Sequence, residues 1–402
     1  MKFSELDGKR IVLWGLGRET IAFREQLSSR LPASTISVTI DDATPEQEAR
    51  EALAQADVLV RSPGVSIYKP LIKQARANGT TVTTATGLWM AERGGRRVIG
   101  VTGTKGKSTT ATVIAHLLAQ LTPTELAGNI GRPVIELLGT PDDTWVVCEL
   151  SSYQIADLTT GPEVAVLTNL SREHTDWHRG EEQYRADKLR LFELPGVRAA
   201  VRPLGDRGGW PLVVPVEQIP LRGVHNAQNV AAAVAAIEAA GFDVPPLPEA
   251  LRGLEALPHR LQTVHTDANG VEWIDDSIST TPESAIAAVE AFAQRPVVLI
   301  AGGSEREQDY RELGQTLAAR TAPTHVILLP DTGGRLAEAA ASHGFGRDRM
   351  STAGDMREAT RLAGQLIEPG GVVLLSPAAP SFNQYANFEQ RGDDFATLAL
   401  RA

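Results

Sequence analysis

Short apolar runs, separated by glycine turns and helical stretches, recur along the whole chain. In the first quarter these runs are residues 10–14, 36–40 and 58–60, and we interpret each one as a buried strand. The glycine turn Gly15-Leu16-Gly17 follows the first run, and a helical stretch leads on to the second, which ends at Asp41-Asp42. Strand, turn, helix and strand in this order predict a parallel α/β unit.

Two further segments repeat this alternation. The second has strands at 98–101, 144–148 and 164–168, with helices at 109–121 and 226–240. The third begins near residue 257 and has strands at 297–300, 325–329 and 372–375. The pattern predicts an α/β fold of three domains, at residues 1–94, 95–256 and 257–402. We expect a Rossmann-like first domain, a central P-loop ATPase-like domain and a Rossmann-like third domain.

Composition narrows the class of protein. The 402 residues are 42% apolar and 22% charged, which is ordinary for a globular protein. The net charge of −10 and the lack of a long basic run disfavour a nucleic-acid partner. Nowhere do about 18 apolar residues follow one another, so we expect no membrane span. The single cysteine, Cys148, cannot form an intrachain disulfide; we expect a buried strand residue in a cytoplasmic protein.

The strongest chemical signal is a glycine-rich loop between a strand and a helix. Residues 100–109 read GVTGTKGKST. Glycines let successive backbone N–H groups face a phosphate, and the helix adds its positive end. Lys107 can reach the β- and γ-phosphates, and Ser108 can place a hydroxyl on Mg²⁺. The loop is one residue longer than the usual phosphate-loop pattern, which argues against an ordinary kinase or GTPase.

Candidates for metal and substrate contacts follow the loop in the sequence: Glu149, His174 and Lys188. Glu149 ends an apolar strand, where a carboxylate would face the ligand crevice of a parallel sheet and could bind Mg²⁺. His174 lies in a polar turn, where it could bind a second Mg²⁺ or contact the substrate. Lys188 falls in a predicted helix, and periodicity alone would leave it as solvated surface.

These motifs together resemble the Mur ligases of peptidoglycan synthesis. The resemblance rests on the loop 100–109, on ELSSYQ at 149–154 and on YRADK at 184–188. Later motifs agree: HNAQN at 225–229, LPHRL at 257–261, DDS at 275–277 and NFEQRGD at 387–393. They span nearly the whole chain in the family's order. The resemblance implies ATP-dependent addition of glutamate to UDP-N-acetylmuramoyl-L-alanine through an acyl phosphate. We expect the protein to be a monomer.

The resemblance also implies a set of binding residues. The UDP substrate would contact Leu16, Arg18, Thr20, Asp41, Asp42, Ser62, Pro63, Gly64, Asn129, Ser151, Gln154 and His174. ATP would contact Gly103, Thr104, Lys105, Gly106, Lys107, Ser108, Thr109, Asn226, Asn229, Arg260 and Asp276. The incoming amino acid would contact Thr280, Arg306, Ser381, Phe382 and Phe388.

The same resemblance gives the catalytic and metal-binding residues. Lys107, Glu149, His174 and Lys188 would be catalytic, and Ser108, Glu149, His174 and Lys188 would hold two Mg²⁺ ions. Lys188 would act as N6-carboxylysine, because a carbamate turns its cation into an oxygen ligand that suits Mg²⁺.

The sequence departs from the family where the amino acid should bind. Many D-glutamate-adding members have a lysine where this chain has Ile278, and Arg306 stands near a second family lysine. Lys105 replaces the usual asparagine of the loop. These features resemble a less common branch that adds L-glutamate, whereas 381–388 is closer to the D-glutamate enzymes. We predict D-glutamate, with L-glutamate as the alternative.

Two other functions are consistent with parts of the sequence. A folylpolyglutamate synthetase shares the central and C-terminal pattern but has no UDP-binding domain, which the turns at 15–20 and 62–64 indicate here. A non-catalytic UDP-sugar-binding relative would be favoured by loss of the four catalytic candidates, and all four are present. The central domain is short for the family, which predicts trimmed loops around residues 194–218.

Overall fold

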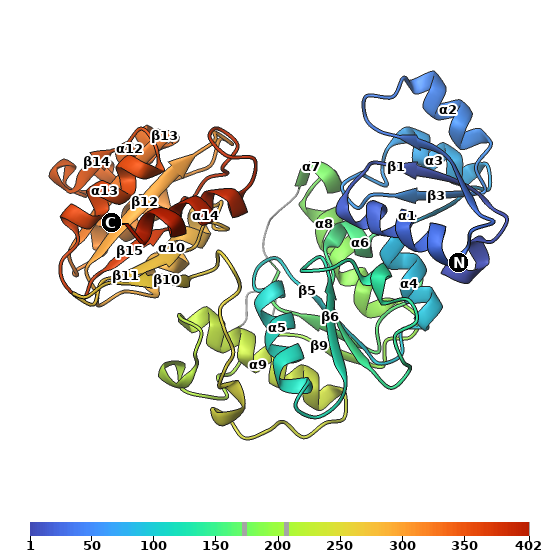
Figure 1. Cartoon of the computed structure of the whole chain (residues 1–402), viewed down its shortest axis with the longest axis horizontal. Coiled ribbons are helices and arrows are strands. Elements are labelled where there is room, and N and C mark those ends of the chain that lie inside the picture. Colours follow the sequence, from blue (N-terminus) through green and yellow to red (C-terminus); the bar gives the residue numbers. More distant parts are fainter. Residues whose placement is uncertain (171–174, 205–208, 402) are drawn as a thin grey trace. The chain divides into compact units, whose positions relative to one another are not determined.

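The chain folds into two compact α/β units (Figure 1). The computed structural model describes residues 1–170, 175–204 and 209–401, without the side chains of 175 and 176. Unit 1 comprises Met1–Pro215 and Ala227–Arg252, and unit 2 comprises Val216–Asn226 and Gly253–Ala402. The described residues form two sheets in unit 1 and one in unit 2, and these fall within the segments 1–94, 95–256 and 257–402. The predicted α/β class is confirmed.

The first sheet of unit 1 is parallel, in the order β2-β1-β3-β4. Its strands are β1 (Arg10–Trp14), β2 (Thr35–Ile40), β3 (Val58–Arg61) and β4 (Thr81–Thr83). Its helices are α1 (Arg18–Arg30), α2 (Glu46–Ala54), α3 (Pro70–Ala77) and α4 (Ala85–Arg93), and the 3-10 helix η1 (Phe3–Leu6) precedes β1. Strands β1 and β3 are buried almost throughout, which explains their continuous apolar runs.

The second sheet is also parallel, in the order β6-β7-β5-β8-β9. Its strands are β5 (Val98–Thr102), β6 (Thr124–Gly128), β7 (Trp145–Glu149), β8 (Val164–Leu167) and β9 (Ala199–Val201). Its helices are α5 (Lys107–Leu118), α6 (Ser152–Ile155), α7 (Thr175–His178), α8 (Glu181–Leu189) and α9 (Val224–Ala239). The short 3-10 helices of unit 1 are η2 (Val134–Leu137), η3 (Arg190–Glu193) and η5 (Glu249–Leu251). The 3-10 helix η4 (Val216–Gln218) and the first three residues of α9 belong to unit 2.

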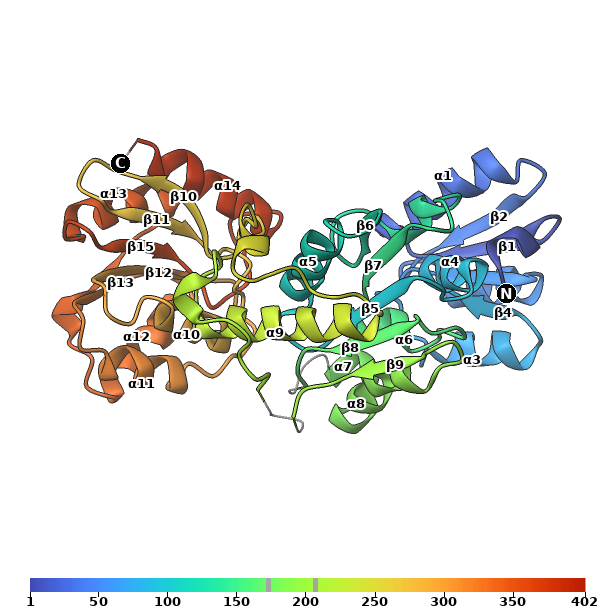
Figure 2. The same cartoon turned by 90° about the horizontal axis from the view of Figure 1, so that it is seen from below.

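A shared core joins the two sheets of unit 1. Both Figure 1 and Figure 2 show α4 between them, and Leu88 and Trp89 of this helix are fully or almost fully buried. They belong to a core that includes Ile11 from the first sheet and Val98 from the second. Helix α4 ends at Gly94, whose left-handed conformation (φ 67°) suits a helix C-terminus, and the chain then turns into β5.

Unit 2 has a sheet in the order β10-β11-β15-β12-β13-β14, parallel except for the pair β10–β11. Its strands are β10 (Gln262–Thr266), β11 (Glu272–Asp275), β12 (Val297–Gly303), β13 (Thr324–Asp331), β14 (Met350–Thr352) and β15 (Val372–Leu375). Its helices are α10 (Pro282–Glu290), α11 (Arg311–Ala319), α12 (Gly333–Ser342), α13 (Met356–Leu366) and α14 (Phe388–Ala399), with η6 (Arg347–Arg349).

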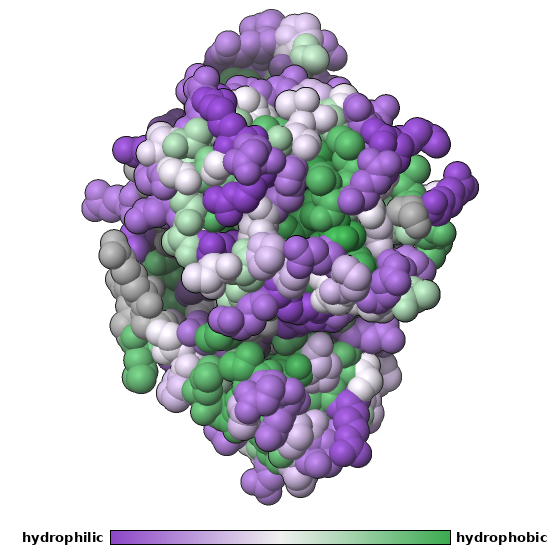
Figure 3. Space-filling view, turned by 90° about the vertical axis from the view of Figure 1, so that its left-hand side faces the viewer, coloured by the Kyte–Doolittle hydropathy of each residue, from purple (hydrophilic) through white to green (hydrophobic). Residues whose placement is uncertain are grey.

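Helices cover both faces of the unit 2 sheet. Leu313 of α11 and Leu336 of α12 pack in one hydrophobic cluster, and Met356 of α13 and Phe395 of α14 pack in another. Figure 3, which faces the side where unit 2 is drawn, shows hydrophilic side chains projecting around smaller hydrophobic patches. Across the described helices of both units, none combines the length and apolarity that a bilayer span needs.

Candidate active site

The glycine-rich loop lies at the carboxyl end of β5, between the ends of β7 and β8. Asn169, just after β8, holds the loop, since its main-chain oxygen accepts from the Thr104 N–H (3.0 Å) and its side-chain oxygen from the Lys105 N–H (2.9 Å). Helix α5 starts at Lys107, so its first N–H groups point back into the loop. The predicted phosphate cradle therefore has the strand–loop–helix geometry that anion binding needs.

Close packing behind the loop explains why position 106 is a glycine. Gly106 caps α5 in the left-handed region (φ 78°), and a Cβ there would collide with the Asn229 amide oxygen. That oxygen accepts a hydrogen bond from the Thr110 hydroxyl (3.2 Å). Asn229 therefore lies against the phosphate loop, from the first turns of α9. Asn226 is the third residue of the same helix, and its amide nitrogen donates to the Arg222 carbonyl (2.7 Å).

Glu149 has the features of a metal ligand. It ends β7 with 1% of its surface exposed, and its Oε1 accepts a hydrogen bond from Asn129 Nδ2 (2.8 Å). Its Oε2 is buried and has no hydrogen-bond partner among the described residues. A buried carboxylate oxygen needs a compensating partner, and a hard cation such as Mg²⁺ would provide one. The donor chemistry at Glu149 therefore fits Mg²⁺.

Lys188 lies against the same loop, in contrast to the surface position that periodicity suggests. It is 2% exposed, and its Nζ donates to the Gly103 carbonyl (2.9 Å). The neighbouring Tyr184 places its hydroxyl 2.8 Å from the Thr104 hydroxyl. His174 lies outside the described residues. Within the described residues no group of three or more His, Cys, Asp and Glu side chains is arranged to hold a metal.

A cavity of about 220 Å³ in unit 1 gathers many of the residues predicted for the UDP substrate. Its lining comprises Arg18, Glu19, Ser62, Pro63, Gly64, Gly128, Asn129, Pro133, Ser151, Tyr153 and Gln154. Asn129 connects it to Glu149, and an Arg18 guanidinium nitrogen donates to the Asn129 carbonyl (3.3 Å). Asn129 thus joins the cavity to the Glu149 carboxylate.

A buried arginine that the sequence did not indicate shapes one wall of this cavity. Arg61 forms a bidentate ion pair with Asp157, with both N–O distances at 2.8 Å, and neither side chain is more than 4% exposed. Its remaining nitrogen donates to the carbonyls of Pro63 (3.1 Å) and Val65 (3.0 Å). The guanidinium therefore fixes the turn at 62–65 to the segment that follows α6. The sequence alone does not indicate this ion pair, because Asp157 lies 96 residues from Arg61.

The other residues predicted for the uridine end are placed at the tips of β1 and β2. Asp42 pairs with Lys69 (3.2 Å), and the Lys69 ammonium lies 5.8 Å from the centre of the Trp14 ring. Asp41 closes its own turn by accepting from the N–H groups of residues 43 and 44. Thr20 is fully buried, and its hydroxyl donates to the carbonyls of the glycine turn. Leu16, by contrast, is 57% exposed.

A buried polar chain connects α8 to the loop before α3. Asp187 accepts hydrogen bonds from the Tyr68 hydroxyl (2.6 Å) and from Gln183 (2.8 Å), and its Oδ2 lies 2.6 Å from Nδ1 of His178. Nε2 of His178 is 2.9 Å from the Ser152 hydroxyl. Ser152, His178 and Asp187 resemble a hydrolase triad in their distances, but Ser152 is 3% exposed and lines neither described cavity. The chain therefore holds elements together.

In unit 2, Asp276 is a buried carboxylate at the end of β11. The Ser376 hydroxyl (2.8 Å) and the Leu261 N–H (3.1 Å) donate to it. Burial raises the pKa of Asp276 to about 6, and these hydrogen bonds and the charge of Arg260 oppose that rise. Arg260 and Asp276, both predicted to contact the nucleotide, therefore lie close enough to interact.

The residues predicted for the amino acid follow β11, β12 and β15, which are neighbours in the sheet. The Arg306 guanidinium lies 5.7 Å from the centre of the Phe382 ring. Gln308, on the same loop as Arg306, donates to the Thr280 carbonyl (2.9 Å). Ser381 is buried and Phe388 begins α14. The structure thus brings Arg306 and Phe382 together, with Thr280 tied to the same loop.

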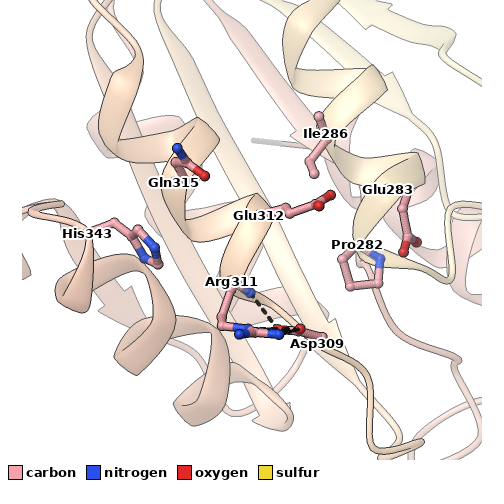
Figure 4. A pocket seen from close by; sticks show the side chains of 8 residues that line it. All are labelled: Pro282, Glu283, Ile286, Asp309, Arg311, Glu312, Gln315 and His343. Atoms are coloured by element: carbon pink, nitrogen blue, oxygen red, sulfur yellow. Dashed lines mark hydrogen bonds and ion pairs between the residues drawn. The ribbon is translucent and has the colours of Figure 1, made fainter.

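A separate cavity of about 470 Å³ opens between the helices of unit 2 (Figure 4). It is lined by Pro282, Glu283, Ile286, Asp309, Arg311, Glu312, Gln315 and His343. An exposed ion pair between Asp309 and Arg311 forms its edge. None of the residues predicted to contact the amino acid lines it.

Comparisons with known proteins agree with these motifs. The chain matches the Mur ligase middle domain over residues 101–207 and the Mur ligase glutamate ligase domain over residues 259–379. Its fold is similar to UDP-N-acetylmuramate-alanine ligase from Thermotoga maritima, with a TM-score of 0.64 at 17% identity, over 98% of this chain and 99% of that one. The fold is also similar to MurF ligase from Thermotoga maritima, solved in complex with ADP. That comparison has a TM-score of 0.61 at 13% identity and covers 100% of this chain and 97% of the other.

Similar sequences align with almost the full length of this chain. Proteins from Micromonospora sp. and from Xanthomonas euvesicatoria, both named UDP-N-acetylmuramoyl-L-alanine–L-glutamate ligase, are each 38% identical. The first alignment covers 98% of this chain and 97% of the relative, and the second 99% and 97%. The first extends over 453 positions, more than the 402 residues here, so that relative contains segments that this chain lacks. The chain belongs to the Mur ligase family.

Proposed function

We propose that this chain is an ATP-dependent ligase that joins glutamate to the L-alanyl carboxyl group of UDP-N-acetylmuramoyl-L-alanine. The observation that carries the proposal is the link between the phosphate loop, Glu149 and the substrate cavity. Asn129 lines the cavity and is hydrogen-bonded to Glu149, and Lys188 contacts the loop. A UDP-linked carboxylate in this cavity would lie next to the site for the ATP phosphates. The need for ATP places the reaction in the cytoplasm.

For the acceptor we propose L-glutamate, although the sequence alone favoured D-glutamate. Two observations support the change. The relatives at 38% identity carry the L-glutamate name. In addition, Ile278 cannot supply the cation that many D-glutamate enzymes have at this position, while Arg306 is placed beside Phe382. Arginine can bind a carboxylate through two parallel hydrogen bonds, which a lysine cannot do.

The reaction would proceed in two steps. An oxygen of the alanyl carboxylate attacks the γ-phosphorus of ATP, the bond to ADP breaks, and an acyl phosphate forms. The amine of glutamate then attacks the acyl carbon, loses a proton, and displaces inorganic phosphate. Both partners of the first step are anions, so Lys107 and the N–H groups at the start of α5 must offset their repulsion.

Magnesium would be held by Glu149 and Ser108, by Lys188 as N6-carboxylysine, and by His174 at a second site. Bound Mg²⁺ supplies positive charge that stabilises the transferring phosphoryl group. Lys188 can take the carbamate form and keep its present contact, because the carbamate nitrogen retains one hydrogen to donate to the Gly103 carbonyl.

A phosphate-release assay tests this function. Purified protein would receive UDP-N-acetylmuramoyl-L-alanine, ATP and Mg²⁺, with D- or L-glutamate in separate reactions. We expect turnover with L-glutamate at a rate at least about 100-fold above that with D-glutamate, since one site cannot place the amines of both enantiomers equally. Turnover with D-glutamate alone would overturn the acceptor, and no turnover with either would overturn the ligase function.

A further inference from the structure

The substrate cavity is lined by a carboxylate, Glu19, that the sequence did not indicate. It is the second residue of α1 and is partly exposed. Its Oε1 accepts a hydrogen bond from the Thr86 N–H (2.7 Å), in the first turn of α4. Its Oε2 accepts one from Gln154 Nε2 (3.0 Å), in α6. The Glu19 carboxylate therefore connects α1 to two other helices at the cavity. These are α4, which precedes the second sheet, and α6, which follows β7.

Gln154 has no hydrogen-bonding capacity left for a ligand. Its Nε2 also donates to the Thr86 hydroxyl (3.0 Å), and its Oε1 accepts from both the N–H and the hydroxyl of Ser151 (each 2.9 Å). A primary amide has two donor hydrogens and two acceptor positions, so all four are in use. Because the Ser151 main-chain nitrogen can only donate, the oxygen of the Gln154 amide must face it.

This arrangement determines what Ser151 can offer to the cavity. Its hydroxyl hydrogen is directed to the Gln154 side-chain oxygen, and its oxygen already accepts from the Gln154 main-chain N–H (3.3 Å). The one position that the hydroxyl keeps for a ligand is therefore an acceptor. The sugar and peptide parts of a UDP-linked precursor carry O–H and N–H donors, whereas its phosphates carry none. Ser151 is thus suited to a part of the substrate that carries donors, such as the sugar–peptide part, and not to its phosphates.

We propose that Glu19 is a positioning residue that orients the Gln154 amide and, through it, the Ser151 hydroxyl as an acceptor for the sugar–peptide part of the substrate. This inference rests on the proposed function. Only an acceptor at both carboxylate oxygens satisfies the donors that face Glu19 from both sides, among them the Thr86 N–H and Gln154 Nε2. A carboxamide at position 19 has one acceptor end and one donor end, so in either orientation a donor faces a donor.

The variant Glu19→Gln tests the role with almost no change in side-chain size. We expect the KM for UDP-N-acetylmuramoyl-L-alanine to rise about tenfold or more, because a mismatched buried donor is costly. The kcat and the KM for ATP should stay within about twofold of wild type, because the phosphate loop is untouched. Glu25→Gln, the same change on the exposed face of α1, is the matched control and should keep the wild-type KM.

A swapped double variant separates positioning from direct substrate contact. Gln154→Glu alone places two carboxylates together and should also raise the KM. In Glu19→Gln/Gln154→Glu the mismatch is removed: the new amide accepts from Thr86 N–H and donates to position 154. The new carboxylate there accepts from Ser151 and from the Thr86 hydroxyl. We expect the KM of the double variant to return to within about threefold of wild type.

Two results would overturn the proposal. The first is a wild-type KM in Glu19→Gln. The second is a KM in the double variant that is no lower than in the single variants, which would mean that the charge of Glu19 itself binds the substrate. Melting curves of all variants identify any that fail to fold. If the wild-type protein has no turnover with this precursor, the proposed function fails, and the positioning role fails with it. Turnover by wild type with unchanged KM in Glu19→Gln rejects the positioning role alone.

Discussion

Replacing Lys188 by alanine is expected to lower the rate of phosphate release by about 10³-fold or more. The side chain is 2% exposed and lies against Gly103 of the phosphate loop. If its working form is a carbamate, the change removes an oxygen ligand and a negative charge from the metal site, where single groups are worth about 10²–10³-fold. The measurement is kcat in saturating ATP, precursor and glutamate.

Added short carboxylic acids such as acetate should restore part of this activity, since they can return the missing oxygens. Lys188→Arg keeps a cation near Gly103 but cannot form a carbamate, and we expect it to be as inactive as the alanine variant. Lys73→Ala, on the exposed surface of α3, is the control and should keep full activity. Near-wild-type rates in Lys188→Ala, or in the arginine variant, would contradict the carbamate role.

Glu149→Gln should weaken the apparent affinity for Mg²⁺ by about 100-fold or more. Within the part of the chain that the structure describes, its buried Oε2 has no hydrogen-bond partner, while Oε1 is held by Asn129. The amide keeps the shape and can still accept from Asn129, but it replaces an anionic ligand with a neutral one. Even partners that only orient metal ligands are worth about 10–100-fold in metal affinity, so a direct ligand should cost more.

The measurement is the rate of phosphate release as a function of Mg²⁺ concentration. High Mg²⁺ should recover part of the activity of Glu149→Gln. The control is Glu125→Gln on the neighbouring strand β6, where the carboxylate is 42% exposed and pairs with Arg132. An unchanged Mg²⁺ dependence in Glu149→Gln would show that Glu149 is not a ligand.

The fold was predictable where strands are buried on both faces. Strand β5 is buried at all five positions, so its apolar run is continuous and easily recognised. The strands that the sequence did not indicate lie at or near sheet edges and are short or polar. Strand β10 (Gln262–Thr266) is an antiparallel edge strand with no fully buried residue, and β4 has only three residues. Such strands carry little hydrophobic signal.

The site was predictable where its residues are close in sequence. The phosphate loop and Glu149 follow single strands, and a parallel sheet places the ends of neighbouring strands together. Glu19 was missed because its partners, Thr86 and Gln154, lie 67 and 135 residues away. The burial of Lys188 was missed for the same reason: Gly103, which it contacts, is 85 residues distant. Only the family resemblance indicated that lysine.

Transfer of a single oxygen atom tests the central claim most directly. UDP-N-acetylmuramoyl-L-alanine labelled with ¹⁸O at both oxygens of the alanyl carboxylate would be turned over with ATP, Mg²⁺ and L-glutamate. The released phosphate would be analysed by mass spectrometry. An acyl-phosphate ligase must transfer one ¹⁸O atom to phosphate in each turnover and leave the other in the new amide. Phosphate released without ¹⁸O would mean that the carboxylate does not attack ATP, and would contradict the account.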